Sequence, residues 1–152
     1  MKKILLIIVA FSIMISCAPP QMPLINNSLR IKTDYEKTWI AAVSYFAENN
    51  FPIQNADKET GFIVSAKFPI TNEQAGQWLK CGDMGLFSKQ EWYMIFNIFV
   101  LKNEHTDSIN ISVNCQFSAL SSVGRASTDI SCYSKGNFEP AVLEFIKGKL
   151  SQ

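Results

Sequence analysis

This sequence of 152 residues has few of the groups from which catalytic and metal sites are built. It contains one His, its 7 Gly form no phosphate-binding loop, and it has no paired clusters of metal ligands. Its 14 basic and 13 acidic residues nearly cancel, whereas a nucleic-acid-binding surface needs a basic stripe. We therefore predict no catalytic residue, no metal, no cofactor and no nucleic-acid partner.

Apolar residues are plentiful. Hydrophobic residues make up 47% of the chain and charged residues 18%, a balance that argues against disorder over most of its length. A chain of this length supports one domain with a tail rather than two domains.

The N-terminus has the pattern of an export signal. Met1-Lys2-Lys3 is positively charged, and residues 4–15 are apolar apart from Ser12. This run is shorter than the roughly 20 residues of a membrane-spanning helix. It fits the apolar core of a secretory signal peptide instead.

The end of this segment adds a lipid-attachment pattern. Met14-Ile15-Ser16-Cys17 resembles a bacterial lipobox, in which a small residue precedes the Cys that carries the lipid. The resemblance implies that residues 1–16 are removed, that Cys17 is lipidated and that Ala18, in place of Asp, directs the protein to the outer membrane. Several acyl chains give a stable anchor, whereas one chain is marginal. The alternative is an ordinary signal peptide cut nearby, with Cys17 unmodified.

A tether and one folded domain follow. Residues 17–27 hold three prolines and no periodicity, which is typical of a flexible tether, and residues 28–152 form the predicted domain. Hydrophobic periodicity and turn residues predict its elements. These are strands at 28–31, 53–57, 62–68, 91–102, 109–118 and 126–132, a helix at 33–49, a second helix capped by Asn137, and a loop at 69–90.

Two local patterns add detail. Thr33 and Glu36 match a capping box, which predicts Thr33 as the N-cap of the first helix. The strand at 62–68 is predicted to have one apolar face, formed by Phe62, Val64, Ala66 and Phe68. The element order β-α-β-β-β-β-β-α predicts an α+β domain with an antiparallel sheet of about five to six strands and two helices packed on one face.

The strand at 91–102 is apolar on both faces apart from Asn97. A sheet with one solvated face alternates polar and apolar residues, so the second face of this strand needs an explanation. One interpretation is an interaction face, because large exposed apolar patches usually mark a contact. Its residues are Tyr93, Ile95, Phe99 and Leu101. The alternative is that the 69–90 loop covers this face with Trp78, Leu79, Leu86 and Phe87.

Three cysteines remain if Cys17 carries lipid. An exported domain meets an oxidising compartment, so one disulfide and one free thiol are expected among them. In a hairpin centred between Val123 and Gly124, Cys115 lies opposite Cys132 and can pair with it. A bond between Cys81 and Cys132 instead closes a long loop and attaches the irregular 69–90 segment to the sheet. The residues alone leave both pairings open.

Two stretches resemble known envelope lipoproteins. Residues 38–63, with Trp39, Pro52 and Asp57-Lys58-Glu59-Thr60-Gly61, resemble the helix-grip modules of the small lipoprotein subunit of the outer-membrane β-barrel assembly machinery. Cys81-Gly82 and residues 132–139 resemble the paired CG and C-x-S-x-G-x-x-E signatures of uncharacterised bacterial lipoproteins. The resemblance implies a helix-grip-like fold, an envelope location and a disulfide between Cys81 and Cys132.

These observations give two functional hypotheses. The first is a non-enzymatic lipoprotein that is anchored to the outer membrane through Cys17, faces the periplasm and serves as an interaction or scaffold module for another envelope protein. The second is a carrier of a small apolar or lipid-like ligand between helix and sheet. A filled core with an exposed strand face favours the first hypothesis, and an empty cavity between helix and sheet favours the second.

Overall fold

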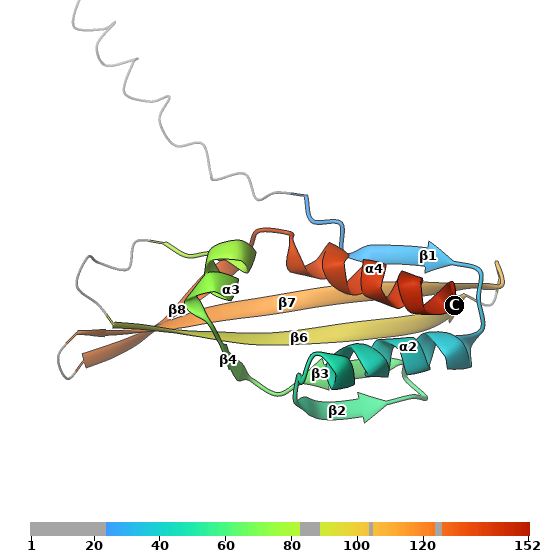
Figure 1. Ribbon diagram of the computed structural model, residues 1–152, viewed down its shortest axis with the longest axis horizontal. Coiled ribbons are helices and arrows are strands. Elements are labelled where there is room, and N and C mark those ends of the chain that lie inside the picture. Colours follow the sequence, from blue (N-terminus) through green and yellow to red (C-terminus); the bar gives the residue numbers. More distant parts are fainter. Residues whose placement is uncertain (1–23, 83–88, 104, 124–125) are drawn as a thin grey trace, which may run out of the picture.

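The computed structural model describes residues 24–82, 89–103, 105–123 and 126–152 (Figure 1). The predicted signal peptide, Cys17, Leu86 and Phe87 lie outside these residues. The described chain forms eight strands and three helices. In chain order they are β1 (Ser28–Ile31), α2 (Tyr35–Glu48), β2 (Ile53–Asp57), β3 (Phe62–Ser65), β4 (Phe68–Ile70), α3 (Asn72–Trp78), β5 (Leu79–Lys80), β6 (Lys89–Asn103), β7 (Ser108–Val123), β8 (Ala126–Ser134) and α4 (Phe138–Leu150).

Strand pairings throughout the described chain are antiparallel, which confirms the predicted α+β class with an antiparallel sheet. The sheet has eight strands rather than the predicted five to six. The prediction missed β5 and merged β3 with β4 into one strand. It also missed α3, so a third helix accompanies the two that were predicted.

Two long strands organise the sheet. β6 and β7 pair along their whole length, from Lys89 opposite Ser122 to Asn103 opposite Ser108. Along its outer edge β6 pairs first with β4 and then with β3, while β7 pairs first with β1 and then with β8. The β6–β7 ribbon is therefore shared by two smaller sheets, one at each end.

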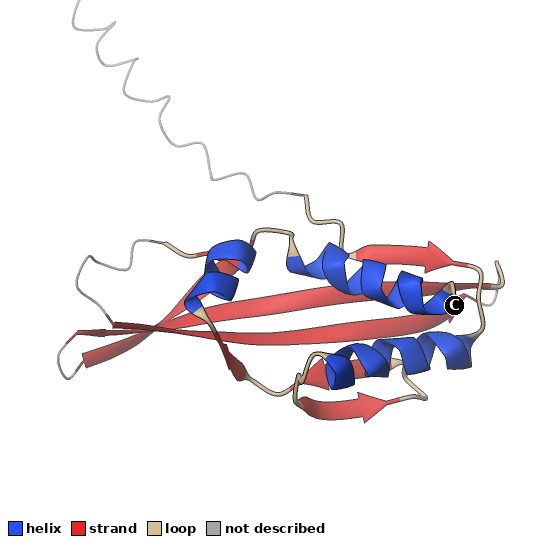
Figure 2. Cartoon of the chain, in the orientation of Figure 1, coloured by secondary structure: helices blue, strands red, loops and turns tan. Residues whose placement is uncertain are grey.

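We name these two parts by what surrounds them. The helix-covered half consists of β1, β2 and β3 with ribbon residues 96–103 and 108–115. The distal half consists of β4, β5 and β8 with ribbon residues 89–95 and 116–123. Figure 2 shows α2 and α4 lying across one face of the helix-covered half, whereas α3 lies beside β8 in the distal half.

Aromatic rings fill the space between the helices and the sheet. Phe46 of α2 stacks on Phe96 of β6 with ring centroids 4.6 Å apart. Phe138 of α4 contacts Phe96 at 5.1 Å, and Tyr45 contacts Phe138 at 6.2 Å. Phe46, Phe96 and Phe138 are each 1% exposed or less. Side chains of this size bury much apolar area and account for a large part of the stability of the fold.

The first helix begins one residue later than predicted. Asp34, not Thr33, is the N-cap of α2, and its carboxylate accepts a hydrogen bond from the backbone N–H of Lys37 at 3.1 Å. Glu36, which the predicted capping box assigned to Thr33, forms an ion pair with Lys58 in the β2–β3 turn instead. Asp is preferred to Thr at the N-cap position, and the Asp34 carboxylate caps this helix.

Residues 69–90 are more regular than the predicted loop. Thr71 and Gln74 form a capping box that starts α3, with Thr71 Oγ1 accepting from the Gln74 N–H at 3.2 Å and Gln74 Oε1 accepting from the Thr71 N–H at 2.9 Å. This signal was readable in the sequence as T-x-x-Q. The helix is only seven residues long and contains Gly76, so its hydrophobic periodicity is weak.

The predicted apolar face of the 62–68 strand was wrong for its first half. Ile63 and Ser65 are fully buried under the helices, while Phe62 and Val64 lie on the opposite face and are only half-buried. Ser65 is accommodated because its Oγ accepts a hydrogen bond from the Phe96 N–H at 3.0 Å. The alternation then shifts by one residue before β4, and Phe68 is buried with the core.

Candidate functional site

The candidate site is the face of the sheet that lies opposite the helices. Along β6 the residues Met94, Phe96 and Ile98 are each 1% exposed or less and face α2 and α4. The intervening residues point to the other side, which we call the open face. Tyr93, Ile95 and Phe99 are half-buried there, and Leu101 is 43% exposed. Within the described ranges, no helix lies over the open face (Figure 1).

The predicted alternative cover is wrong for Trp78 and Leu79. Trp78 packs against Phe138 of α4 with ring centroids 5.0 Å apart, and Leu79 is buried in the same core. Both residues therefore lie on the helix side of the sheet. Leu86 and Phe87, the other two predicted covering residues, lie outside the described residues.

An apolar patch occupies the open face in the helix-covered half. Phe62 of β3 and Phe99 of β6 are register partners, and their rings contact edge to face at 6.0 Å. Val64 and Leu101 complete this patch. Phe99 and Leu101 were predicted from the sequence as part of an interaction face. Phe62 and Val64 were predicted to share one face with Phe68, which the structure buries on the other side of the sheet.

A row of amides separates the patch from the rest of the open face. Asn114 of β7 donates from Nδ2 to Asn97 Oδ1 at 3.3 Å, and Asn27 donates from Nδ2 to Asn114 Oδ1 at 3.1 Å. The row crosses three neighbouring segments of the sheet. The four predicted interaction residues therefore do not form one surface, because Phe99 and Leu101 lie on one side of Asn97 and Tyr93 and Ile95 on the other.

On the distal side of the amide row the open face is hollowed. A hollow of about 490 Å³ is lined in part by Lys67, Tyr93, Ile95, Gln116, Ser118 and Ser131. Lys67 holds its Nζ 4.8 Å from the centroid of the Tyr93 ring and 3.8 Å from Asp129 Oδ2. The Tyr93 hydroxyl donates to Glu91 Oε2 at 2.9 Å. This hydrogen bond, together with the charge of Glu91, raises the pKa of Tyr93.

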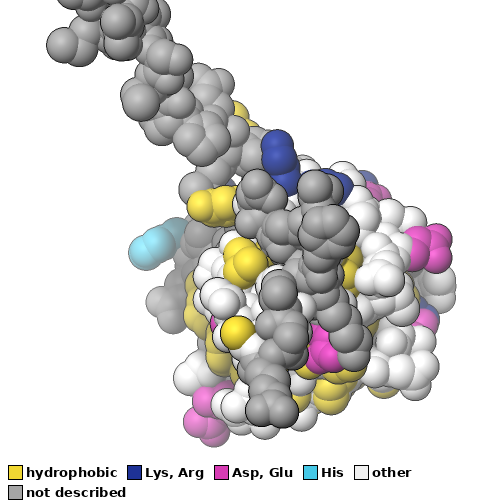
Figure 3. Space-filling model, turned by 90° about the vertical axis from the view of Figure 1, so that its left-hand side faces the viewer, with side chains coloured by type: hydrophobic (Ala, Val, Ile, Leu, Met, Phe, Trp, Pro, Cys, Tyr) yellow, Lys and Arg dark blue, Asp and Glu magenta, His cyan; other side chains and the backbone are white. Residues whose placement is uncertain are grey.

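Figure 3 shows the molecule from its distal end. Hydrophobic side chains reach the surface there among white atoms, which belong to the backbone and to side chains that are neither hydrophobic nor charged.

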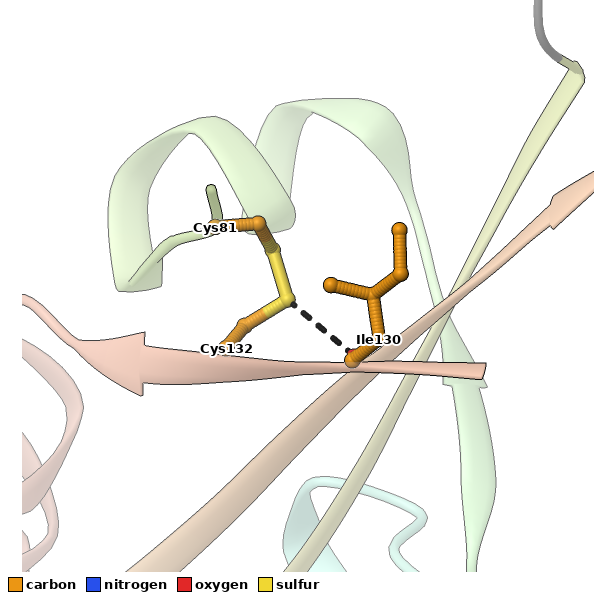
Figure 4. Close-up of a disulfide and its surroundings, with 3 residues drawn as sticks. All are labelled: Cys81, Ile130 and Cys132. Atoms are coloured by element: carbon orange, nitrogen blue, oxygen red, sulfur yellow. Dashed lines mark hydrogen bonds between the residues drawn. A yellow bond between two sulfur atoms is a disulfide. The ribbon is translucent and has the colours of Figure 1, made fainter. Parts of the chain in front are cut away.

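A disulfide joins Cys81, which follows β5, to Cys132 of β8 (Figure 4). Three hydrogen bonds reinforce this attachment of α3. The Lys135 N–H donates to the Trp78 carbonyl at 2.8 Å, Asn137 Nδ2 donates to the Gln77 carbonyl at 2.8 Å, and Lys135 Nζ donates to the Gly76 carbonyl. Asn137 occupies the N-cap position of α4, but its side chain makes no cap hydrogen bond to that helix.

Cys115 is a free thiol. The predicted hairpin register that set it opposite Cys132 was wrong by two residues, because Phe117 is the partner of Cys132. Burial, followed by the charge and hydrogen bonding of Glu139, raises the pKa of the Cys115 thiol. A thiol of this kind is a poor nucleophile at neutral pH.

A buried carboxyl group lies beside that thiol. Glu139, in the first turn of α4, is 2% exposed and accepts a hydrogen bond from Ser134 Oγ at 2.9 Å. Ser134 Oγ in turn accepts from the Gly136 N–H at 3.0 Å. These bonds connect the end of β8 to the start of α4 and give a structural role to residues that the sequence analysis treated only as part of a signature.

Across residues 24–82, 89–103, 105–123 and 126–152, no group of three or more His, Cys, Asp or Glu residues is placed to hold a metal ion. Over those same ranges, none of the helices has the length and apolar character needed to cross a bilayer. No protein-family model matches the chain, and no curated protein matches it.

Proposed function

We propose that this protein is a non-enzymatic lipoprotein, anchored to the outer membrane through Cys17 and facing the periplasm, whose domain is an interaction or scaffold module of an envelope complex. One observation carries the proposal. The open face of the sheet presents the apolar patch of Phe62, Val64, Phe99 and Leu101 without a covering element among the described residues. Contiguous exposed apolar surface of this kind is typical of protein interfaces.

The packing of the interior supports this role over that of a carrier. A lipid-like ligand held between helix and sheet requires an apolar cavity there. The rings of Phe46 and Phe96 are in direct stacking contact at 4.6 Å, and Tyr45, Phe51 and Phe138 surround them. Aromatic side chains thus occupy the place that a carrier leaves for its cargo.

The attachment of the N-terminal segment supports action close to a membrane. The Val113 N–H donates to the Asn27 carbonyl at 2.8 Å, and Ile25 lies against Gly136, where an added Cβ would approach Ile25 to 3.4 Å. Contacts of the N-terminal segment with the rest of the described chain therefore reach back to Ile25. Seven residues lie between Cys17 and Ile25, and the eight Cα–Cα steps between them reach about 28 Å at full extension. A lipid on Cys17 would therefore keep Ile25 within about that distance of the bilayer.

The helix-grip likeness belongs to this proposal as well. The resemblance to envelope lipoproteins implies a helix-grip-like fold and a disulfide between Cys81 and Cys132. A long helix laid across an antiparallel sheet, the β2–β3 hairpin and the Cys81–Cys132 bond support that part of the proposal. We take the partner to be another envelope protein.

Photo-crosslinking of the lipidated protein in its own cells tests the proposal. A benzophenone amino acid at Leu101, which is 43% exposed in the patch, is compared with the same residue at Ile40, which is 61% exposed on the outer side of α2. We expect one dominant protein adduct from position 101 and not from position 40. Mass spectrometry then identifies the partner.

The control positions make the result decisive. Equal labelling from both positions means that exposure rather than the patch governs contact, which contradicts the proposal. Absence of any protein adduct at position 101, with intact membrane attachment, also contradicts it. Loss of membrane attachment in a Cys17→Ala variant is the separate test of the lipid anchor.

A further inference from the structure

The hollow of the distal half differs from the apolar patch in shape. Lys67 directly precedes β4, and Asp129 lies on β8, with β6 and β7 between them. Three strand spacings in a flat sheet amount to about 14 Å. The two residues are also displaced along the strands, because Lys67 precedes the partner of Met94 while Asp129 lies at the level of Glu91, and four residues of strand add about 13 Å. A flat sheet would thus hold their Cα atoms about 19 Å apart, farther than a Lys and an Asp side chain bridge. Yet Lys67 Nζ lies 3.8 Å from Asp129 Oδ2. The twist of the sheet therefore brings the two sides of its open face toward each other, and the ion pair joins them.

The strong twist of the ribbon explains this curl of the open face. Paired strands are rotated relative to one another, and the rotation accumulates along long two-stranded ribbons. β6 and β7 have 15 and 16 residues, and toward its distal end the ribbon they form turns nearly edge-on to the viewer (Figure 1). The concavity is thus a property of the backbone and is present before any ligand arrives.

The lining of the hollow has a distinct chemistry. Tyr93 opposite Ser118 and Ile95 opposite Gln116 are outward-facing register pairs, and Ser131 lies opposite Ser118 on the other side. Two hydroxyls and one carboxamide each donate and accept hydrogen bonds. Ile95 and the Tyr93 ring supply apolar surface next to them.

Acidic groups outnumber the one basic group at the hollow, because Asp129 lies beside Lys67 and Glu91 accepts a hydrogen bond from the Tyr93 hydroxyl. These charges disfavour an anionic ligand. Lys67 is engaged by Asp129 and by the Tyr93 ring, so it is not a free cation for a phosphate or carboxylate. Gln116, Ser118 and Ser131 carry no charge. A ligand that fits these groups is neutral, has several neighbouring groups that both donate and accept hydrogen bonds, and has an apolar face.

We propose that the hollow is a binding site for a small neutral saccharide. Its hydroxyls bond to Gln116, Ser118 and Ser131, and the C–H face of a sugar ring rests on Ile95 and the edge of Tyr93. The volume of about 490 Å³ lies within the range of small-molecule sites, roughly 300–1,000 Å³. This site does not depend on the apolar patch or on the identity of a protein partner, so either proposal can fail alone.

Saturation-transfer NMR tests the proposal on the full chain in an amine-oxide detergent, which carries no sugar headgroup. The probes are maltose and N,N′-diacetylchitobiose, with glucose 6-phosphate as the charged comparison. We expect saturation transfer to a neutral saccharide with millimolar affinity, because the hollow is open to solvent. We expect weaker transfer to the sugar phosphate.

Paired variants locate the site. Gln116→Ala with Ser118→Ala removes two hydrogen-bonding groups from the hollow and is expected to raise the dissociation constant about tenfold or more. Asn110→Ala with Ser112→Ala changes the same strand and the same face outside the hollow, and is expected to leave binding unchanged. No transfer to either neutral saccharide, tighter binding of the phosphate, or equal loss in both double variants overturns the proposal.

Discussion

The two ends of the β6–β7 ribbon are built from the same alternation of residues but are stabilised in different ways. In the helix-covered half, α2 and α4 bury one face under stacked and edge-to-face rings such as Phe46 on Phe96. In the distal half, α3 adds Ala75 and Trp78 to the core, and the Cys81–Cys132 disulfide and three hydrogen bonds from Lys135 and Asn137 also attach it to the sheet. Burial stabilises both halves, and cross-links add to it in the distal half.

The open face also differs between the halves. Opposite α2 and α4 it presents the patch around Phe99, and toward the distal end of the twisted ribbon the same face forms the hollow around Ile95. One pair of strands thus offers an apolar surface at one end and a neutral polar concavity at the other.

The largest expected loss of stability comes from a substitution in the core of the helix-covered half. Phe46→Ala removes a ring that is fully buried and stacked on Phe96. We expect the free energy of unfolding to fall by about 3–5 kcal/mol, because the cavity closes only in part. Urea unfolding followed by tryptophan fluorescence measures this change in the free energy of unfolding. Ile40→Ala on the same helix, at a side chain 61% exposed, should cost less than about 0.5 kcal/mol. Equal costs at both positions would mean that this core does not dominate stability.

The disulfide is the matching test of the distal half. The double variant Cys81→Ala/Cys132→Ala opens a loop whose ends are 51 residues apart in sequence. We expect a loss of about 2–4 kcal/mol, with hydrogen exchange accelerated in α3, β5 and β8 more than in α2. Replacing both cysteines leaves no new thiol to pair with Cys115. Uniform acceleration over all elements would show that the two halves unfold as one unit.

Substitution of two glycines that have positive φ compares how far the backbone tolerates a side chain at two places in the fold. Gly61, at φ 72°, lies in the β2–β3 turn, and an added Cβ would overlap the carbonyl oxygen of Val100. Gly136, at φ 76°, lies before α4, and its Cβ would meet only Ile25 at 3.4 Å. Ala at Gly136 should cost about 1–2 kcal/mol from backbone strain alone, and Ala at Gly61 about 1 kcal/mol more because β6 must move. Thermal unfolding of both variants decides the order, and a larger effect at Gly136 would refute it.

Local patterns predicted much of the helix-covered half. The strand at 53–57 and the two long helices were recognised from alternation and from helical spacing, and those signals are carried by the residues themselves. The inward face of β3 was not recognised, because a buried Ser65 is stabilised by a hydrogen bond to the distant Phe96 N–H. Hydrophobicity alone assigns such a serine to solvent.

The distal half was less predictable. The β7–β8 register differs by two residues from the predicted one, because the sequence around Val123 has no turn signal strong enough to fix it. The hollow depends on the curl of the whole ribbon, and no short motif encodes that. The open face of β6 was nevertheless identified as unusual from its sequence, because apolar residues occupy both sides of one strand.

The smallest expected effect concerns the ion pair that spans the hollow. Lys67 and Asp129 have side chains that are 47% and 63% exposed, so solvent screens their attraction. If backbone twist sets the curl, a double-mutant cycle with Lys67→Ala and Asp129→Ala should give a coupling of about 0.5 kcal/mol or less.

The pair Lys147–Glu144 on α4, with exposures of 51% and 73%, is a matched control and should give a similar value. Both couplings should shrink further in 1 M salt, where the Debye length is about 3 Å. A coupling well above that of the control, together with loss of the hollow in the Lys67→Ala variant, would mean that the ion pair and not the ribbon twist holds the distal half in its curled form.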